Sequence, residues 1–371
     1  MRIAIIHDWL TGMRGGERVL EALCEIFPQA HLYTLLHHPG TLSSTIERLP
    51  IHTSFIQNLP FSKRGYRKYL PLFPMAIERF DLKGYDLVLS CSHCVAKGII
   101  PPPDAIHISY ILTPMRYAWD MYGEYFGAKG NKMISLFIHY LRMWDVTSSQ
   151  RVDHFLAISK HVERRIRKFY RREADVIHPP VDIHRFKLGD KKGDFFVIVS
   201  SLVPYKGIDL AIEAFRRLRY PLKIIGSGPE EKRLRARGNS NIEFLGWQPD
   251  EVVSDAYSKC RALIFPGEED FGIVPVEAMA SGRPVLAYGR GGALETVIPY
   301  DQGTRAEGEA PTGLFFYERD VGSLMNVIER FIKIEGAFDP AAIRNHALSW
   351  DREIFKEKLQ KNIFAKLGSR C

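Results

Sequence analysis

Residues 195–218 decide the fold, and they read FFVIVSSLVPYKGIDLAIEAFRRL. The first five residues form an apolar run of strand length, and the last ten place apolar side chains at helical spacing. A short loop with a proline, a lysine and a glycine separates the two runs. Because a helix must cross the sheet between two parallel strands, this strand–loop–helix order is the repeating unit of a parallel sheet.

The same unit recurs along the 371 residues of the chain. In the second half the pattern predicts further strands at 222–225, 242–245, 262–265, 285–287 and 314–316, with helices between them. In the first half it predicts strands at 3–6, 86–90, 106–112 and 154–158, and helices at 17–27, 132–146 and 160–169. The sequence therefore predicts an α/β protein with two Rossmann-like domains, whose parallel sheets face each other across a cleft.

A stiff segment marks the boundary between the two domains. The run His178-Pro179-Pro180-Val181-Asp182 cannot continue a helix, and residues 187–194 are polar and charged. Residues 349–367 have the spacing of a last helix. We expect a first domain at 1–185, a second domain at 186–348 and a terminal helix at 349–371 that returns to the first domain.

The composition excludes several classes of protein. Hydrophobic residues make up 46% of the chain and charged residues 25%, which is typical of a globular protein rather than a disordered or fibrous one. No apolar run has the length of about 18 residues that a membrane span needs, and the N-terminus does not resemble a signal peptide. Five cysteines do not suggest a disulfide scaffold. We expect a cytoplasmic protein.

The charge is unevenly distributed between the two halves. Residues 1–185 carry 24 Lys and Arg against 17 Asp and Glu, whereas the remainder is nearly neutral. Two clusters in the first half, at 63–69 and 164–172, mix basic with aromatic residues. Such clusters suit an anionic membrane surface or a lipid diphosphate, although a solvated charged face is the alternative for each. No nucleic-acid-binding module is present, so we expect no nucleic-acid partner.

Residues 265–280, FPGEEDFGIVPVEAMA, carry the most informative motif. Glu269 lies on the predicted loop and Glu277 in the helix that follows. A carboxylate can accept hydrogen bonds from two neighbouring hydroxyl groups, so this pair suits the recognition of a polyol. The backbone amides of Phe271, Gly272 and Ile273 lie at the start of the helix, where they suit an anion or sugar oxygens.

Two further loops follow predicted strands. The loop TGMRGGE at 11–17 contains Gly15 and Gly16, whose backbone N–H groups can approach an anion, but its spacing is not that of a dinucleotide-binding fingerprint. The loop at 201–207 contains Lys206, which can reach a diphosphate as a point charge. A tight glycine turn and a surface lysine are the respective alternatives.

The sequence gives no sign of a metal site. Cys91-Ser92-His93-Cys94 is a single C-x-x-C motif, and a structural zinc site needs a second pair of ligands. We interpret this motif as small residues in a turn between a strand and a helix. No Asp-x-Asp motif is present to hold a divalent cation on a diphosphate.

Taken together, these motifs resemble glycosyltransferase family 4, which has the GT-B fold and retains the anomeric configuration. Glu269 and Glu277 match the E-x7-E motif of that family. The resemblance extends over most of the chain and includes residues 7–17, 113–117, 179–182, 203–206, 226–229 and 289–296. Within the family, the chain is most similar to the mannosyltransferases that build bacterial surface polysaccharides.

The resemblance implies a metal-independent reaction without a cofactor. The donor would be a nucleotide-diphosphate sugar, GDP-mannose, and the acceptor a lipid-diphosphate-linked saccharide or a polysaccharide at the inner face of the cytoplasmic membrane. By resemblance, Glu277 would hold the donor ribose and Glu269 the transferred sugar. Lys206 and the N–H of Gly16 would contact the diphosphate. The loop with Gly226 and Gly228 would pass near the base.

The sequence departs from the family at two positions. Ser201 stands where the family usually has an arginine, and Leu112 stands where it often has a histidine. Arg116 or Arg14 is a candidate for the missing positive charge. Asp8 and His7 are candidates for positioning, because they lie at the end of the first strand near the cleft. Two alternatives stay open: a nucleotide-sugar epimerase of the GT-B fold, and a non-catalytic nucleotide-sugar-binding or scaffold protein.

Overall fold

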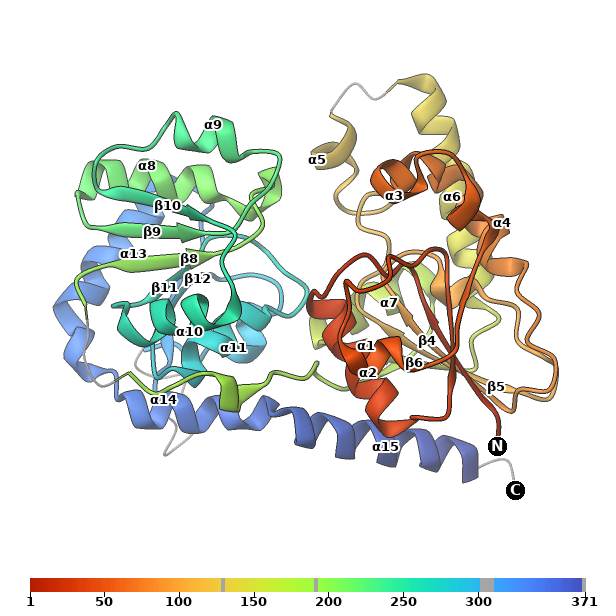
Figure 1. Ribbon diagram of the computed structural model, residues 1–371. Coiled ribbons are helices and arrows are strands. Elements are labelled where there is room, and N and C mark those ends of the chain that lie inside the picture. The colour runs from red at the N-terminus through yellow and green to blue at the C-terminus, as the bar shows by residue number, and fades with distance from the viewer. Residues whose placement is uncertain (128–130, 190–192, 301–309, 369–371) are drawn as a thin grey trace. The chain divides into compact units, whose positions relative to one another are not determined.

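The computed structural model describes residues 1–127, 131–189, 193–300 and 310–368 (Figure 1). The chain divides into two compact units, of which the first comprises Met1–Pro180 together with the residues from Glu353 onward, and the second comprises Val181–Arg352. This division falls earlier in the chain than residue 185. The reason is local: the N–H of Val181 donates to the carbonyl of Trp350 at 3.0 Å, and Ile183 is fully buried in the second unit.

The first unit is built on seven parallel strands in the order β3-β2-β1-β4-β5-β6-β7. The three central strands, β1, β4 and β5, are buried along their whole length, as expected for a parallel sheet that is covered on both faces. The predicted strands correspond to β1, β4, β5 and β6. The bounds of the seven strands are β1 Ile3–His7, β2 His31–Thr34, β3 Ile51–Thr53, β4 Leu87–Ser92, β5 Ile106–Ile111, β6 His154–Ala157 and β7 Ala174–Val176.

The helices of the first unit include a long one near its middle and the last helix of the chain. Side-chain caps start two of them: Asn131 accepts the N–H of Met133, and Ser159 accepts the N–H of Val162. The last helix packs on the first unit, where Phe355 lies edge-on to Tyr110. The bounds are α1 Gly15–Ile26, α2 Ser44–Glu47, α3 Ser62–Gly65, α4 Phe73–Glu78, α5 Tyr122–Phe126, α6 Lys132–Ser149, α7 Lys160–Tyr170 and α15 Arg352–Gly368.

The second unit is built on six parallel strands in the order β10-β9-β8-β11-β12-β13. All six strand predictions are confirmed to within one residue at each end. The strands are β8 Phe196–Val199, β9 Leu222–Ile225, β10 Ile242–Gly246, β11 Leu263–Phe265, β12 Val285–Tyr288 and β13 Gly313–Phe316. The helices are α8 Ile208–Leu218, α9 Glu231–Arg235, α10 Asp250–Lys259, α11 Ile273–Ala280, α12 Ala293–Thr296, α13 Val321–Ile334 and α14 Pro340–Ala347.

Each sheet has one point where the strand order reverses. The chain builds outward from β1 to β3 and then from β4 to β7 on the other side, so the reversal in the first unit lies between β1 and β4. In the second unit it lies between β8 and β11. In open α/β sheets, the loops at the carboxyl ends of the two reversing strands diverge and leave a crevice that binds ligands. Among the described helices, none has both the length and the apolar composition of a membrane span.

Candidate functional site

The reversal point of the second unit brings together the two side chains that the sequence singles out most strongly. Lys206 lies in a short 3-10 turn, Pro204–Lys206, after β8, and Glu269 lies in the loop between β11 and α11. The ammonium group of Lys206 donates to the carboxylate of Glu269. Their side chains are 12% and 23% exposed. An ion pair that solvent can reach therefore lies at the carboxyl edge of the sheet.

Close packing of two glycine-containing loops makes this contact possible. A Cβ atom at Gly267 would lie 2.9 Å from the Cα of Lys206. Gly207 has a φ of +67°, and a Cβ there would lie 2.8 Å from the carbonyl oxygen of Pro266. A larger residue at either position would push the two loops apart and separate Lys206 from Glu269.

Two more strand ends complete this edge. After β9, the N–H of Gly226 donates to the carbonyl of Gly246 at 2.7 Å, and a Cβ at Gly228 would lie 2.4 Å from the carbonyl of Leu202. After β12, the N–H of Gly292 donates to the carbonyl of Glu269 at 2.8 Å. The loops that hold the predicted donor residues thus brace one another through their backbones.

Helix α11 carries the second glutamate of the motif. Gly272 precedes the helix with a φ of +88°, and Ile273 is its first residue. Glu277 is half-buried, and its Oε2 accepts a hydrogen bond from the hydroxyl of Tyr257 at 3.1 Å. Burial and the adjacent carboxylate raise the pKa of Tyr257 well above its usual value, so this hydroxyl remains a donor. Tyr257 thereby fixes one oxygen of Glu277.

The other predicted residues of the second unit lie on the same edge. Ser201 is exposed on the loop after β8, and Phe271 is buried in front of α11. Trp247, which the sequence analysis did not single out, follows β10 directly and is 74% exposed. A tryptophan in the polar segment just after the predicted strand 242–245 is the signal that could have identified it, because tryptophan is mostly buried in folded proteins.

The reversal point of the first unit is organised around Asp8, which follows β1. Its carboxylate is fully buried and accepts four backbone N–H groups from the loop after β4, at distances of 2.6–3.0 Å. These groups belong to His93, Cys94, Val95 and Ala96. This geometry gives Asp8 the task of holding the loop.

His93 is a residue whose position the sequence analysis missed. Its Nδ1 lies 3.0 Å from Oδ2 of Asp8, its side chain is 26% exposed, and its ring lies edge-on to Trp9. Burial lowers the pKa of His93 in spite of the nearby carboxylate, so the ring is neutral at pH 7. No local pattern in the sequence reveals this position, because it depends on the register that pairs His7 of β1 with Cys91 of β4.

The sequence places Gly15 and Gly16 in a loop, but in the structure they are the first two residues of α1. A buried acid–base pair lies next to this start of the helix. Nε2 of His7, which is fully buried, lies 3.7 Å from Oε1 of Glu17. Burial alone would lower the pKa of His7, but the adjacent Cys91 and Glu17 raise it above the usual value. Burial alone would raise the pKa of Glu17, but the adjacent His7 lowers it below its usual value. Glu17 also accepts the N–H of Arg14 at 3.1 Å, which caps the start of α1.

Leu112 and Arg116 border this region of the first unit. A Cβ at Gly16 would lie 2.8 Å from Cδ1 of Leu112, so the leucine packs directly on the first turn of α1. Arg116 is half-buried in the loop after β5. Arg165 anchors that loop by donating to Thr113 Oγ1 at 2.9 Å and to Asp120 at 2.7 Å.

The sequence predicts the C-x-x-C motif in a turn, but in the structure Cys91 and Ser92 belong to β4, and only His93 and Cys94 lie in the loop that follows. Cys91 and Cys94 are both buried thiols whose pKa is raised by burial. Within the described ranges, no group of three or more His, Cys, Asp or Glu side chains is arranged to hold a metal ion.

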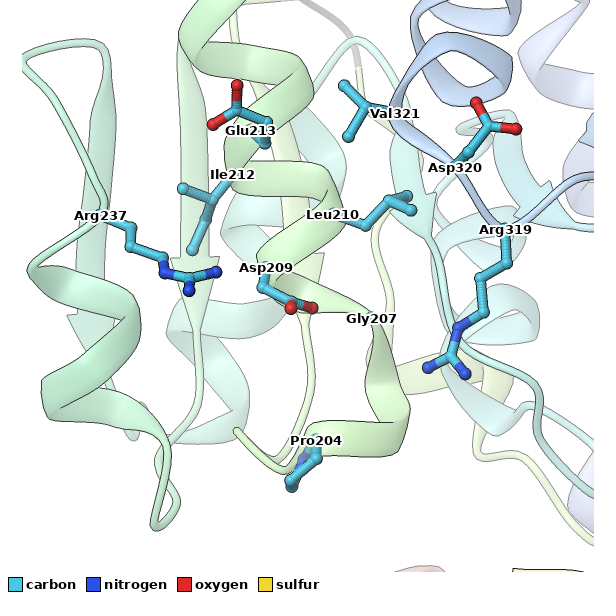
Figure 2. Close-up of a pocket in the computed structure, with 10 residues that line it drawn as sticks. All are labelled: Pro204, Gly207, Asp209, Leu210, Ile212, Glu213, Arg237, Arg319, Asp320 and Val321. Atoms are coloured by element: carbon cyan, nitrogen blue, oxygen red, sulfur yellow. The ribbon is translucent and has the colours of Figure 1, made fainter. Parts of the chain in front are cut away.

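A cavity of about 480 Å³ borders the loop that carries Lys206 (Figure 2). Arg319 lies on its wall and donates to the carbonyl of Tyr205 at 3.0 Å. None of the predicted donor residues lines this cavity, so it is distinct from the Lys206–Glu269 edge. Its lining mixes acids and arginines with apolar groups, namely Pro204, Gly207, Asp209, Leu210, Ile212, Glu213, Arg237, Arg319, Asp320 and Val321.

Comparisons of sequence place the second unit among known proteins. Residues 181–347 match the family model of glycosyl transferases group 1. The chain is 33% identical over 168 residues to an uncharacterized glycosyltransferase of Methanocaldococcus jannaschii. This match covers 44% of this chain and 47% of the relative. A second match is to a GDP-mannose-dependent monoacylated alpha-(1-6)-phosphatidylinositol monomannoside mannosyltransferase of Corynebacterium glutamicum. The identity is 30% over 243 residues, and the match covers 56% of this chain and 61% of the relative. The chain thus spans about half the length of these relatives.

Comparisons of structure cover both units. The sucrose-phosphate synthase of Thermosynechococcus elongatus aligns over 100% of both chains with a TM-score of 0.74 and 16% sequence identity. Anabaena HepE in complex with UDP-glucose aligns over 98% of this chain and 100% of that chain, with a TM-score of 0.69 and 16% identity. The chain therefore has the two-domain Rossmann-like GT-B fold of glycosyltransferases, and its second unit is similar in sequence to glycosyl transferases group 1.

Proposed function

We propose that the protein is a retaining glycosyltransferase that moves mannose from GDP-mannose to a lipid-linked or polysaccharide acceptor. The observation that carries the proposal is the Lys206–Glu269 pair at the reversal point of the unit that matches the family model. The relative from Corynebacterium glutamicum, which is named as GDP-mannose-dependent, supports the donor. The neighbouring structure with bound UDP-glucose supports a nucleotide sugar in general.

Lys206 is proposed to bind the donor diphosphate. In the structure, the ammonium group of Lys206 is neutralised by the carboxylate of Glu269. A diphosphate that arrives at this edge replaces the carboxylate as the partner of Lys206 and frees Glu269 to accept hydrogen bonds from the sugar hydroxyls. The lysine and the amides at the start of α11 then stabilise the negative charge that develops on the leaving diphosphate, which makes the reaction metal-independent.

Glu277 is proposed to hold the ribose. The hydroxyl of Tyr257 occupies one side of Oε2, which leaves the carboxylate oriented for a pair of neighbouring hydroxyls. Gly226 and Gly228 lie on the loop after β9 at the same edge, and without side chains they allow a base to approach their backbone. The exposed ring of Trp247 provides an apolar face next to that loop.

The first unit is proposed to bind the acceptor. His93, held by Asp8, and the first turn of α1 with Gly15 and Gly16 lie at its reversal point, and Arg116 follows the next strand. The positive balance of residues 1–185 suits an acceptor with a lipid diphosphate at the inner face of the cytoplasmic membrane.

A ligand screen followed by a transfer assay tests the proposal. GDP-mannose at about 100 times its dissociation constant should add about 2.7 kcal/mol to the free energy of unfolding in a thermal-shift series that also contains UDP-glucose and ADP-glucose. The variant K206A should lose this stabilisation, whereas K358A, at an exposed lysine of α15, should keep it. Radiolabelled mannose should then move to a lipid extract.

The other outcomes separate the alternatives. If donor stabilises the chain but no mannose is transferred, the protein is a nucleotide-sugar-binding scaffold. If an epimerised sugar nucleotide appears without acceptor, it is an epimerase. If none of the three nucleotide sugars stabilises the chain, the donor assignment is wrong.

A further inference from the structure

The outer face of α6 exposes four large apolar side chains. Met133 is 79% exposed, Leu136 72%, Tyr140 48% and Met143 52%. Their spacing of three and four residues places them on one side of the helix. We call these four residues the α6 stripe. A contiguous exposed apolar surface of this kind marks an interaction site more often than an ordinary protein surface.

The inner face of the same helix is already used for folding. Ile138 and Leu141 are buried in the hydrophobic cluster of the first unit, and Ile134 and Phe137 pack against it. The helix therefore has two apolar sides. One side fills the core, so a small rotation of the helix cannot bury the stripe without exposing that side.

Four exposed cations lie in the segment that leads into α4. They are Lys63, Arg64, Arg67 and Lys68, in α3 and in the 3-10 helix Tyr66–Leu72. Phe61 precedes them with its side chain 85% exposed and a φ of +58°, a left-handed conformation that is uncommon for a bulky residue. The segment presents an aromatic ring and four positive charges to solvent.

The second basic cluster of the sequence is used differently. Arg165 is buried against Asp120, and Arg167 pairs with Glu163 at 2.7 Å and Glu173 at 2.8 Å. Arg172 donates to backbone carbonyls at the end of α6 and after it. Arg164, Lys168 and Arg171 of this cluster remain exposed, so charge alone does not separate the two clusters. Residues 63–68 differ because none of their four cations is paired with an acid within the described part of the chain and because they adjoin the elements that pack on α6.

The α6 stripe and the four cations belong to one region of the first unit. The 3-10 helix Tyr66–Leu72 runs directly into α4, and Trp144 of α6 donates to Glu78 of α4 at 2.8 Å. Tyr66 and Phe73 share the hydrophobic cluster with Ile138 and Leu141. In Figure 1, α3, α4 and α6 accordingly group together in the first unit.

We infer that the α6 stripe and the four cations of residues 63–68 together dock on an anionic lipid bilayer. An apolar helix face can lie among the acyl chains just below the headgroups while nearby lysines and arginines meet the lipid phosphates. A second copy of the chain is a poorer occupant, because a symmetric contact would bring two sets of four cations together. This inference rests on the proposed function in one respect: it brings the acceptor unit to the surface where a lipid-linked acceptor resides.

Vesicle sedimentation with the full chain tests the docking. The chain should sediment with vesicles of phosphatidylcholine and phosphatidylglycerol at low salt, and much less with phosphatidylcholine alone. The double variant M133Q/L136Q should weaken the partition coefficient about tenfold or more, because two inserted apolar side chains are lost. The variant K63E/R64E should also weaken it about tenfold or more, because each cation near an anionic surface adds about 1 kcal/mol.

Matched variants on α15 provide the controls. F364Q changes an apolar side chain that is 48% exposed, and K358E/K361E makes the same change in net charge as K63E/R64E. Neither control should change sedimentation more than about twofold. If the wild-type chain fails to sediment with anionic vesicles, or if the controls lose as much binding as the stripe variants, the inference is wrong. It is also wrong if M133Q/L136Q turns a dimer into a monomer and leaves sedimentation unchanged.

The docking and the proposed function fail separately. Stabilisation by a nucleotide sugar is measured in solution without lipid, and the α6 stripe and residues 63 and 64 take no part in it. A chain that responds to the donor but ignores vesicles contradicts only the docking. A chain that sediments with vesicles but responds to no nucleotide sugar contradicts only the proposed function.

Discussion

The two units have the same kind of sheet but fill their reversal points differently. In the first unit the crevice between β1 and β4 is occupied by the chain itself: the carboxylate of Asp8 is buried and accepts four backbone N–H groups, and His7 and Glu17 form a second buried pair. In the second unit the crevice between β8 and β11 is edged by glycine loops and by Lys206 and Glu269, which solvent can reach.

The difference shows what each set of polar groups is for. Buried charges that are saturated by the protein's own donors stabilise the fold, and their removal leaves unsatisfied groups. Charges that pair across two loops and remain partly exposed contribute little to stability, but they are free to exchange partners. We therefore expect substitutions in the first crevice to change the free energy of unfolding and those in the second to change ligand binding.

The largest expected effect is on Asp8. In D8N an NH2 group replaces one carboxylate oxygen. It faces two of the four backbone N–H donors and cannot accept their hydrogen bonds, so the free energy of unfolding should fall by on the order of 4 kcal/mol. The matched variant K206M in the second crevice should change it by no more than about 1 kcal/mol. Urea unfolding followed by tryptophan fluorescence measures both. Equal losses in the two variants would remove the distinction between the crevices.

The next effect is the pH dependence of the buried His7–Glu17 pair. Because the pKa of His7 is raised in the folded state, the pair stabilises fully below the ordinary histidine pKa of about 6.5 and loses its contribution as pH rises toward the raised value. E17Q should therefore cost about 3 kcal/mol near pH 6 and clearly less near pH 9. Urea unfolding at both pH values gives the difference.

A more exposed pair in the same unit is the control for that measurement. Glu47 lies 3.1 Å from Nε2 of His37, and the two side chains are 25% and 12% exposed. E47Q should cost no more than about 1 kcal/mol at either pH. A loss in E17Q that does not change with pH would show that His7 is uncharged in the folded protein.

A smaller effect is expected at Glu277, this time on binding. E277Q keeps an oxygen for Tyr257 but loses the charge that strengthens hydrogen bonds to ribose hydroxyls, so donor affinity should fall about tenfold. The free energy of unfolding should change by less than about 0.5 kcal/mol. Isothermal titration with GDP-mannose measures the first quantity. E357Q, at an exposed position of α15, should change neither, and an unchanged affinity in E277Q would contradict the ribose assignment.

The smallest effect is expected at Tyr257, where the hydroxyl orients Glu277. Y257F should lower donor affinity about threefold and the free energy of unfolding by about 1 kcal/mol. Y110F is a matched control, because the hydroxyl of Tyr110 donates to the carbonyl of Ile177 in the first unit at 2.7 Å. It should lose similar stability and bind the donor normally. If both variants bind the donor equally well, Tyr257 does not position Glu277.

The sequence predicted the second unit better than the first. Its strands carry unbroken apolar runs, because both faces of a parallel sheet are covered, and such runs are visible without knowledge of their partners. The strands β2, β3 and β7 of the first unit were not predicted. They have three or four residues each and lie toward the two edges of the sheet, so pairing with a neighbouring strand defines them more than their own pattern does.

The candidate site was predictable as a set of loops but not as a set of contacts. Lys206 and Glu269 follow strands, which is enough to place both at the carboxyl edge, but they are 63 residues apart and their ion pair depends on the strand order. Asp8 was a candidate because it ends a strand. Its four N–H donors come from residues 85–88 positions away, which no local pattern reveals.

The pairing of Val181 with Asp351 means that the second unit is an insertion whose two ends are neighbours. The chain enters this unit at Val181 and leaves it at Arg352, and the first unit is completed only by the residues that follow. In domains with adjacent ends, excision and circular permutation are well tolerated. Residues 181–352 are therefore a natural single fragment for ligand binding, and a short linker from Pro180 to Glu353 would rejoin the first unit.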